Sequence, residues 1–113
     1  MLDNTMNKHL NIFIEGKLER VDFNFYSQSA AIKFDVNAIY KNGDTRHIEI
    51  EVEGDAKSVE AYAKFLKEGA LKSHIELFRT EEGKFKNIEG FTSLKVHKEK
   101  FAKIKRVLKK YRK

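Results

Sequence analysis

The chain has 113 residues, enough for one compact domain with its own hydrophobic core and too few for two. Hydrophobic residues make up 41% of it, which argues against a disordered chain although 35% of the residues are charged. The absence of cysteine excludes disulfides, thiol nucleophiles and cysteine-bound metals, and it favours a reducing, cytoplasmic setting. No apolar stretch reaches the roughly 18 residues of a membrane span, so we expect neither a transmembrane segment nor a signal peptide.

The net charge of +6 is concentrated at the C-terminus. Residues 96–113 hold nine Lys and Arg residues against one Glu, a net charge of +8, whereas residues 1–95 hold 14 basic and 16 acidic residues. Four large apolar residues recur at helical spacing in this segment, which predicts a basic amphipathic helix. They are Phe101, Ile104, Leu108 and Tyr111.

Two interpretations of this predicted helix remain open. In the first, its cations contact RNA, DNA or an anionic membrane surface. The candidate contact residues are Lys103, Lys105, Arg106, Lys109, Lys110 and Arg112. In the second, the helix packs on the edge or the open face of a sheet, and its lysines remain in water.

The first half of the chain predicts a strand, a helix and a hairpin. After an N-terminal lead of residues 1–8, apolar side chains alternate over residues 9–18, a strand pattern that ends near Gly16. Asp22 is a suitable N-cap for a helix over residues 23–34, where apolar residues recur at steps of three and four. A strand over residues 36–41 follows.

The turn residues Asn42-Gly43-Asp44 then lead into a strand over residues 46–53, which completes the hairpin. This strand alternates apolar and acidic side chains, so we expect one buried face and one solvated face. The apolar residues are Ile48, Ile50 and Val52, and the acids are Glu49, Glu51 and Glu53.

In the second half, Asp55 is placed to cap a helix that runs to about Glu68, before Gly69. A strand over residues 74–79, a loop over residues 81–83 and a final segment that completes the same sheet edge follow. The order strand, helix, strand, strand, helix, strand predicts an α+β ferredoxin-like domain over residues 9–95. In this fold an antiparallel sheet carries two helices on one face.

Five segments within residues 9–95 resemble the acylphosphatase family in order and spacing. Residues 16–24, Gly-Lys-Leu-Glu-Arg-Val-Asp-Phe-Asn, align without a gap with the family's Gly-x-Val-Gln-Gly-Val-Gly-Phe-Arg loop. Residues 38–42, Ala-Ile-Tyr-Lys-Asn, resemble its Gly-Trp-Val-x-Asn strand end, and residues 52–55, Val-Glu-Gly-Asp, its helix entry. Residues 65–69 and 87–91 resemble the exit of its second helix and its closing strand.

The resemblance implies hydrolysis of acyl phosphates to carboxylate and phosphate, with neither metal nor cofactor. It implies that backbone N–H groups of the loop and one arginine hold the phosphate, while an asparagine positions the attacking water. The asparagine position is Asn42, and the arginine position is occupied by Asn24. The loop positions are Glu19, Arg20, Val21, Asp22 and Phe23.

This loop departs from the family pattern in charge and in flexibility. The amide of Asn24 is neutral and shorter than a guanidinium, which pairs two phosphate oxygens with a planar fork. Arg20 and Asp22 replace two glycines that would permit positive φ, and Glu19 and Asp22 place carboxylates where a phosphate dianion would bind.

These departures predict a domain that has lost efficient hydrolysis and acts as a binding or scaffolding module, with phosphate or acyl phosphate as weak ligands at most. The alternative is a functional or weakly active acylphosphatase in which Arg20 supplies the missing charge and Asn42 orients water. A solvated Arg20 paired with Glu19 or Asp22, and an Asn42 that serves only the turn, are the structural interpretations of the same residues. The four histidines lack metal-ligand spacing, so no metal site is expected.

Overall fold

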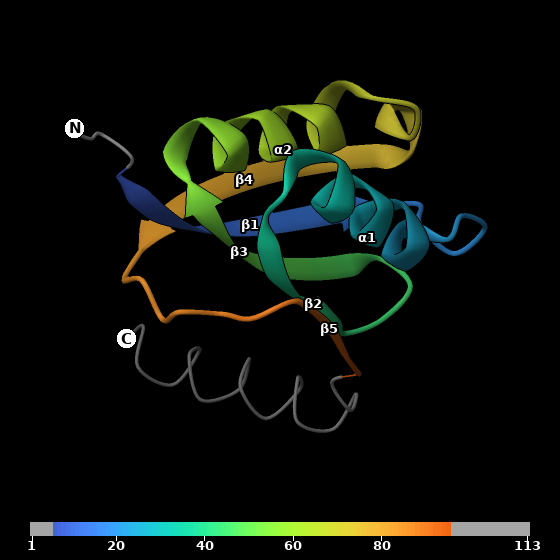
Figure 1. Cartoon of the computed structure of the whole chain (residues 1–113). Coiled ribbons are helices and arrows are strands. Elements are labelled where there is room, and N and C mark those ends of the chain that lie inside the picture. The colour runs from blue at the N-terminus through green and yellow to red at the C-terminus, as the bar shows by residue number, and fades with distance from the viewer. Residues whose placement is uncertain (1–5, 96–113) are drawn as a thin grey trace, which may run out of the picture.

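The computed structural model describes residues 6–95, which form a five-stranded sheet with two helices packed against one face (Figure 1). The elements in chain order are β1 (Asn7–Gly16), α1 (Phe23–Phe34), β2 (Asn37–Asn42), β3 (His47–Asp55), α2 (Ala56–Glu68), the short 3-10 helix η1 (Lys72–His74), β4 (Ile75–Gly83) and β5 (Phe91–Lys95). The strand order across the sheet is β4-β1-β3-β2-β5. The predicted basic helix over residues 96–113 lies outside the described residues.

The sheet is mixed, because β5 runs parallel to β2 while the other pairs are antiparallel. The prediction of an antiparallel sheet whose last segment completes the β4 edge is therefore wrong. After β4 the chain crosses to the opposite edge through residues 84–90, here called the crossover (Figure 1). The loop predicted over residues 81–83 is also wrong, since β4 continues to Gly83 opposite His9 of β1.

β4 can continue to Gly83 because this position has no side chain. A side chain here would collide with neighbours on β1. A Cβ at this position would lie 2.7 Å from Cδ2 of His9 and 3.0 Å from Nδ2 of Asn11. Both of these side chains therefore pack directly over the backbone of the edge strand.

Both predicted helix caps are confirmed. The Asp22 carboxylate accepts a hydrogen bond from the Phe25 N–H at 3.0 Å, and the Asp55 carboxylate accepts from the N–H groups of Lys57 and Ser58. Helix α1 ends at Asp35, which adopts the left-handed conformation. The two boundaries follow from local side-chain chemistry, which is why the sequence predicts them correctly.

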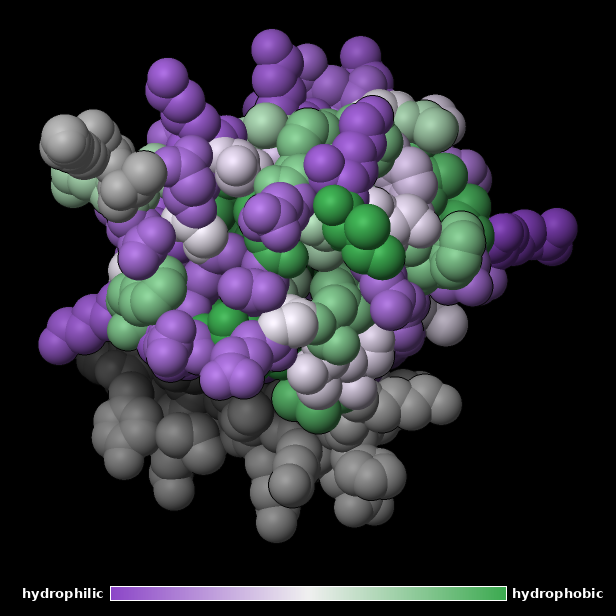
Figure 2. Space-filling model, in the orientation of Figure 1, coloured by the Kyte–Doolittle hydropathy of each residue, from purple (hydrophilic) through white to green (hydrophobic). Residues whose placement is uncertain are grey.

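The hydrophobic core lies between the helices and the sheet. Alternate residues of the strands face the helices, among them the fully buried Ile12, Ile50 and Val52. Tyr62 and Leu66 of α2 are equally buried. The side of the molecule seen in Figure 2 is covered mostly by hydrophilic residues, and exposed hydrophobic residues are scattered among them. The predicted inward face of the hairpin is confirmed.

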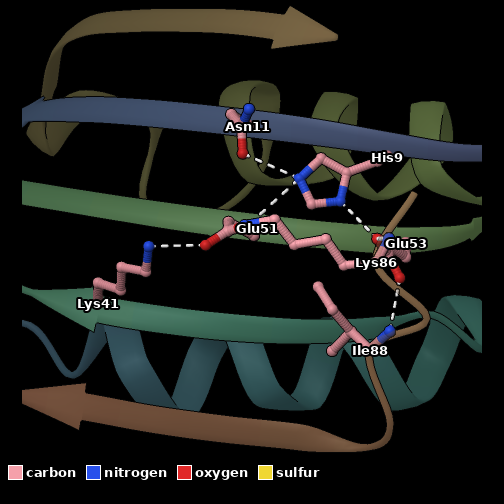
Figure 3. A network of polar contacts seen from close by, with 7 residues as sticks. All are labelled: His9, Asn11, Lys41, Glu51, Glu53, Lys86 and Ile88. Carbon is pink, nitrogen blue, oxygen red and sulfur yellow. Dashed lines mark hydrogen bonds and ion pairs between the residues drawn. The ribbon is translucent and has the colours of Figure 1, made fainter. Parts of the chain in front are cut away.

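The outward face of β3 holds a buried polar network rather than solvated acids (Figure 3). Glu53 is 0% exposed, and its carboxylate accepts hydrogen bonds from the N–H groups of Lys86 at 2.5 Å and Ile88 at 2.6 Å. Nδ1 of the buried His9 contacts the same carboxylate at 2.5 Å. The prediction of a solvated Glu53 is wrong because the crossover passes over it and donates two backbone N–H groups.

Glu51, two residues earlier on the same face, is also buried and is surrounded by cations. The Lys41 ammonium lies 2.6 Å from its carboxylate and the Lys86 ammonium 2.7 Å. Nε2 of His9 lies 3.3 Å from the same carboxylate and 3.0 Å from the Asn11 amide oxygen. Glu51 is therefore also wrongly predicted to be solvated, and the network links β1, β2, β3 and the crossover.

The substitution Glu53→Gln should lower the free energy of unfolding by about 3 kcal/mol, because one carboxylate oxygen becomes an N–H donor that faces other donors. Glu49→Gln is the matched control: Glu49 lies on the same face of β3, is only half-buried and makes no ion pair with residues 6–95, so its loss should stay within about 0.5 kcal/mol. Urea unfolding of both variants measures the difference. Equal losses would contradict the role assigned to Glu53.

Stability should also fall in acid. Burial raises the pKa of Glu51, but hydrogen bonds from Lys41 and Lys86 outweigh it and lower the pKa to about 2. The pKa of Glu53 is likewise lowered, because the N–H groups of Ile88 and Lys86 outweigh the effect of burial. Both carboxyls therefore bind protons more readily in the unfolded chain.

Their stabilisation is complete above the unfolded pKa near 4.5 and should be lost as the pH falls from there toward 2, with about 3 kcal/mol attributable to Glu51. Urea unfolding between pH 6 and about pH 2 tests this expectation. The variant Glu51→Gln should show a smaller loss over the same range. An unchanged pH dependence in that variant would contradict the assignment.

Candidate functional site

The loop over residues 17–22 starts where β1 meets its neighbours. Gly16 donates its N–H to the Arg46 carbonyl oxygen at 3.1 Å, and Lys17 donates to the His74 carbonyl oxygen at 2.9 Å. A Cβ at Gly16 would lie 2.0 Å from that His74 oxygen, so only glycine fits. The leading glycine of the loop is therefore required by close backbone approach.

Two buried side chains, Leu18 and Phe23, anchor the loop, whereas Glu19, Arg20 and Asp22 are exposed. The Val21 N–H donates to the Leu18 carbonyl oxygen at 3.3 Å, which closes a tight turn.

The loop backbone contains no left-handed residue. Within residues 6–95, positive φ values occur at Asp35, Asn87, Gly54 and Gly90, and none of these lies in loop 17–22. The type of anion-binding nest that pairs a right-handed with a left-handed residue is therefore absent from this loop.

Asn24, in the first turn of α1, is held by the last strand. Its Oδ1 accepts a hydrogen bond from the Ser93 hydroxyl at 2.8 Å. Ser93 pairs with Tyr40 in the β2–β5 ladder, and Asn42 lies two residues beyond Tyr40 on the same face of β2. The fold thus places the two asparagines singled out from the sequence at the same sheet edge, near the end of β2.

Asn42 is the last residue of β2, where it pairs with Ile48 of β3 and Lys95 of β5. It belongs to the strand end, and the turn proper begins after it. Ser93 was not identified from the sequence, because nothing local in the pattern places β5 beside α1.

Two carboxylates, Asp22 and Asp44, lie near this edge of the sheet. Burial raises the pKa of Tyr40 and the charge of Asp22 raises it further, so the phenol stays protonated and Asp22 lies within electrostatic reach. In the β2–β3 turn, burial raises the pKa of Asp44, but hydrogen bonds from the Arg46 N–H and from His47 outweigh it and lower the pKa.

Arg20 forms no ion pair within the part of the chain that the structure describes. The predicted pairing of Arg20 with Glu19 or Asp22 is therefore absent there. The polar groups that the edge offers to a ligand are two side-chain amides, a serine hydroxyl and the exposed Arg20.

Two further searches of residues 6–95 gave negative results. No group of three or more His, Asp or Glu side chains is arranged to hold a metal ion. None of the helices described is long and apolar enough to span a membrane.

Two α-helices on one face of a mixed sheet define an α+β domain of the ferredoxin-like type. The acylphosphatase family model matches residues 10–93, and the chain belongs to this family. An acylphosphatase of Geobacillus kaustophilus is 26% identical over 90 residues, which cover 74% of this chain and 96% of that protein.

Two solved structures share the fold at lower identity. The crystal structure of an acylphosphatase from Bacillus subtilis matches with a TM-score of 0.70 and 22% identity, over 79% of this chain and 99% of that one. Full-length HypF in its phosphate- and nucleotide-bound form matches with a TM-score of 0.73 and 24% identity. The match covers 81% of this chain, which spans only 12% of the HypF chain.

The cap and the charge of Asp22 can be separated by substitution. Asp22→Ala should lower the free energy of unfolding by about 1 kcal/mol, because the Phe25 N–H loses its acceptor. Asp22→Asn should stay within about 0.5 kcal/mol of the wild type, since asparagine caps helices about as well as aspartate. Thermal and urea unfolding measure both. A large loss in Asp22→Asn would show that the charge, and not the cap, stabilises this end of α1.

Proposed function

We propose that this member of the acylphosphatase family has lost efficient acyl phosphate hydrolysis and acts as a binding module. The observation that carries the proposal is the state of Asn24, which stands at the family's arginine position with its oxygen engaged by Ser93 at 2.8 Å. Its remaining nitrogen can donate two hydrogen bonds and carries no charge. A guanidinium offers five donors in a fixed fork together with a permanent positive charge.

The expected loss of rate is large. A positioned arginine is worth on the order of 10³–10⁵ in rate in other phosphoryl-transfer systems, or about 4–7 kcal/mol of barrier. Glu19 and Asp22 are exposed on the loop and repel a phosphate dianion. The loop also contains no left-handed residue that would let its N–H groups converge. Each of these features supports weak phosphate binding and slow chemistry.

Weak acyl phosphate hydrolysis is the second candidate function. Two features favour it: Gly16 is retained where close backbone approach requires it, and Asn42 is retained at the end of β2, on the same face as Tyr40. In this case Arg20 supplies the charge by turning toward the loop amides, and Asn42 orients the attacking water. Contact with an anionic partner through residues 96–113 belongs to the binding proposal, as does a cytoplasmic setting, which the lack of cysteine favours.

Hydrolysis of benzoyl phosphate by the full chain tests the proposal. The wild type should show no turnover above the uncatalysed rate. Asn24→Arg should gain activity, while Asn24→Lys should gain less, because an ammonium has charge but no planar fork. Asn24→Arg and Asn24→Lys form a matched pair that separates the effect of positive charge from the effect of the planar guanidinium.

Turnover by the wild type that is lost in both Arg20→Ala and Asn42→Ala would sink the proposal in favour of the second candidate. If turnover persists in Arg20→Ala but is lost in Asn42→Ala, hydrolysis is intact without any loop guanidinium, and the proposal is again wrong. Far-UV circular dichroism of every variant shows whether the fold is retained.

A further inference from the structure

We infer that the sheet face opposite α1 and α2 binds residues 98–112 of the same chain as an amphipathic helix. This face is here called the open face. The inference concerns a surface on the other side of the sheet from Asn24 and Asn42, so it does not depend on whether the domain hydrolyses acyl phosphates.

The open face carries two pairs of large apolar side chains, one on β4 and β1 and one on β2 and β5, with the acidic face of β3 between them. The strand registers place four large apolar side chains on it, one from each of four strands. They are Leu77, Phe13, Ile39 and Leu94. Leu77 is 46% exposed and Leu94 is 47% exposed, so a substantial apolar area on two different strands remains available. Burial of such side chains would contribute roughly 25 cal/mol per Å².

A cavity of about 230 Å³ opens beside the pair on β4 and β1. Phe13, Leu77 and Arg79 line one side of it, and Lys41, Gly43 and Glu49 line another. The Arg79 guanidinium lies 4.6 Å from the centre of the Phe13 ring, which leaves an amphipathic wall. The cavity therefore suits a large apolar side chain.

Charge complementarity selects the occupant. The strands place five glutamates on the open face against two basic residues, Lys41 and Arg79. Among residues 6–95, Glu49 and Glu81 make no ion pair. Residues 96–113 carry a net charge of +8, and their four large apolar residues share one face of a helix. A basic helix with one apolar stripe matches a face that combines exposed apolar side chains with an excess of glutamates.

The position and length of the segment also fit. β5 ends at Lys95, which pairs with Asn42 beside the cavity residue Gly43. Only two residues separate Lys95 from Lys98, so the helix must start within about 10 Å of this edge. Fifteen helical residues are about 22 Å long. Five strands spaced about 4.8 Å apart span about 20 Å, so the helix can cross the end of the face near Leu77 and Leu94, away from the crossover over Glu53.

A single tryptophan tests the inference, because the chain contains none. In full-length Phe101→Trp, the indole should emit at short wavelength and be poorly quenched by acrylamide. Adding Leu77→Lys or Leu94→Lys should shift the emission to longer wavelength and raise the quenching constant several-fold. Ile32→Lys is the matched control, since Ile32 is 75% exposed on α1, away from the open face.

An indole that is fully exposed in Phe101→Trp alone would overturn the inference. Equal quenching in the parent and in both face variants would do the same. Leu77 and Leu94 are partly exposed, and circular dichroism checks that each variant keeps the fold. Loss of the short-wavelength emission on dilution of the protein would assign the contact to a second copy of the chain, which also overturns it. Burial that is independent of concentration and reduced by both face variants supports it.

Discussion

The carboxylate of Glu53 is the interaction on which the arrangement of the C-terminal half depends. It accepts hydrogen bonds from the backbone N–H groups of Lys86 and Ile88 in the crossover, and it contacts the buried His9 ring. The crossover leads the chain from one edge of the sheet to the other, where β5 pairs with β2. A buried carboxylate is tolerated because each oxygen has donors, and its removal would leave those donors unpaired.

The site is linked to this carboxylate through β5. Ser93 reaches Asn24 because the crossover delivers β5 to the β2 edge. The domain has the fold of the acylphosphatase family. Gly16 permits close approach to the His74 backbone, and Asn42 is the last residue of β2. Fold and activity are separate properties, because one architecture can carry different sites.

The sequence was sufficient for features determined by nearby residues. Asp22 and Asp55 cap their helices through residues two or three positions away, and alternation identified the core face of β3. It was insufficient for features determined by distant residues. The burial of Glu53 depends on N–H groups 33 and 35 positions away, so its alternating pattern wrongly suggested a solvated acid. The Asn24–Ser93 contact, 69 positions apart, had no local signal for the same reason.

The 69 positions between Asn24 and Ser93 also set the order in which this part of the domain folds. Residues 24 and 42 are synthesised long before Ser93, and β5 has no ladder to join until β2 has paired with β3. Local helices and hairpins form quickly, whereas contacts between distant residues wait for the intervening chain to close. On a ribosome, the N-terminal strands and α1 therefore emerge with an open edge at β2. The two asparagines acquire their final surroundings only when the last strand has left the exit tunnel and crossed beneath the sheet.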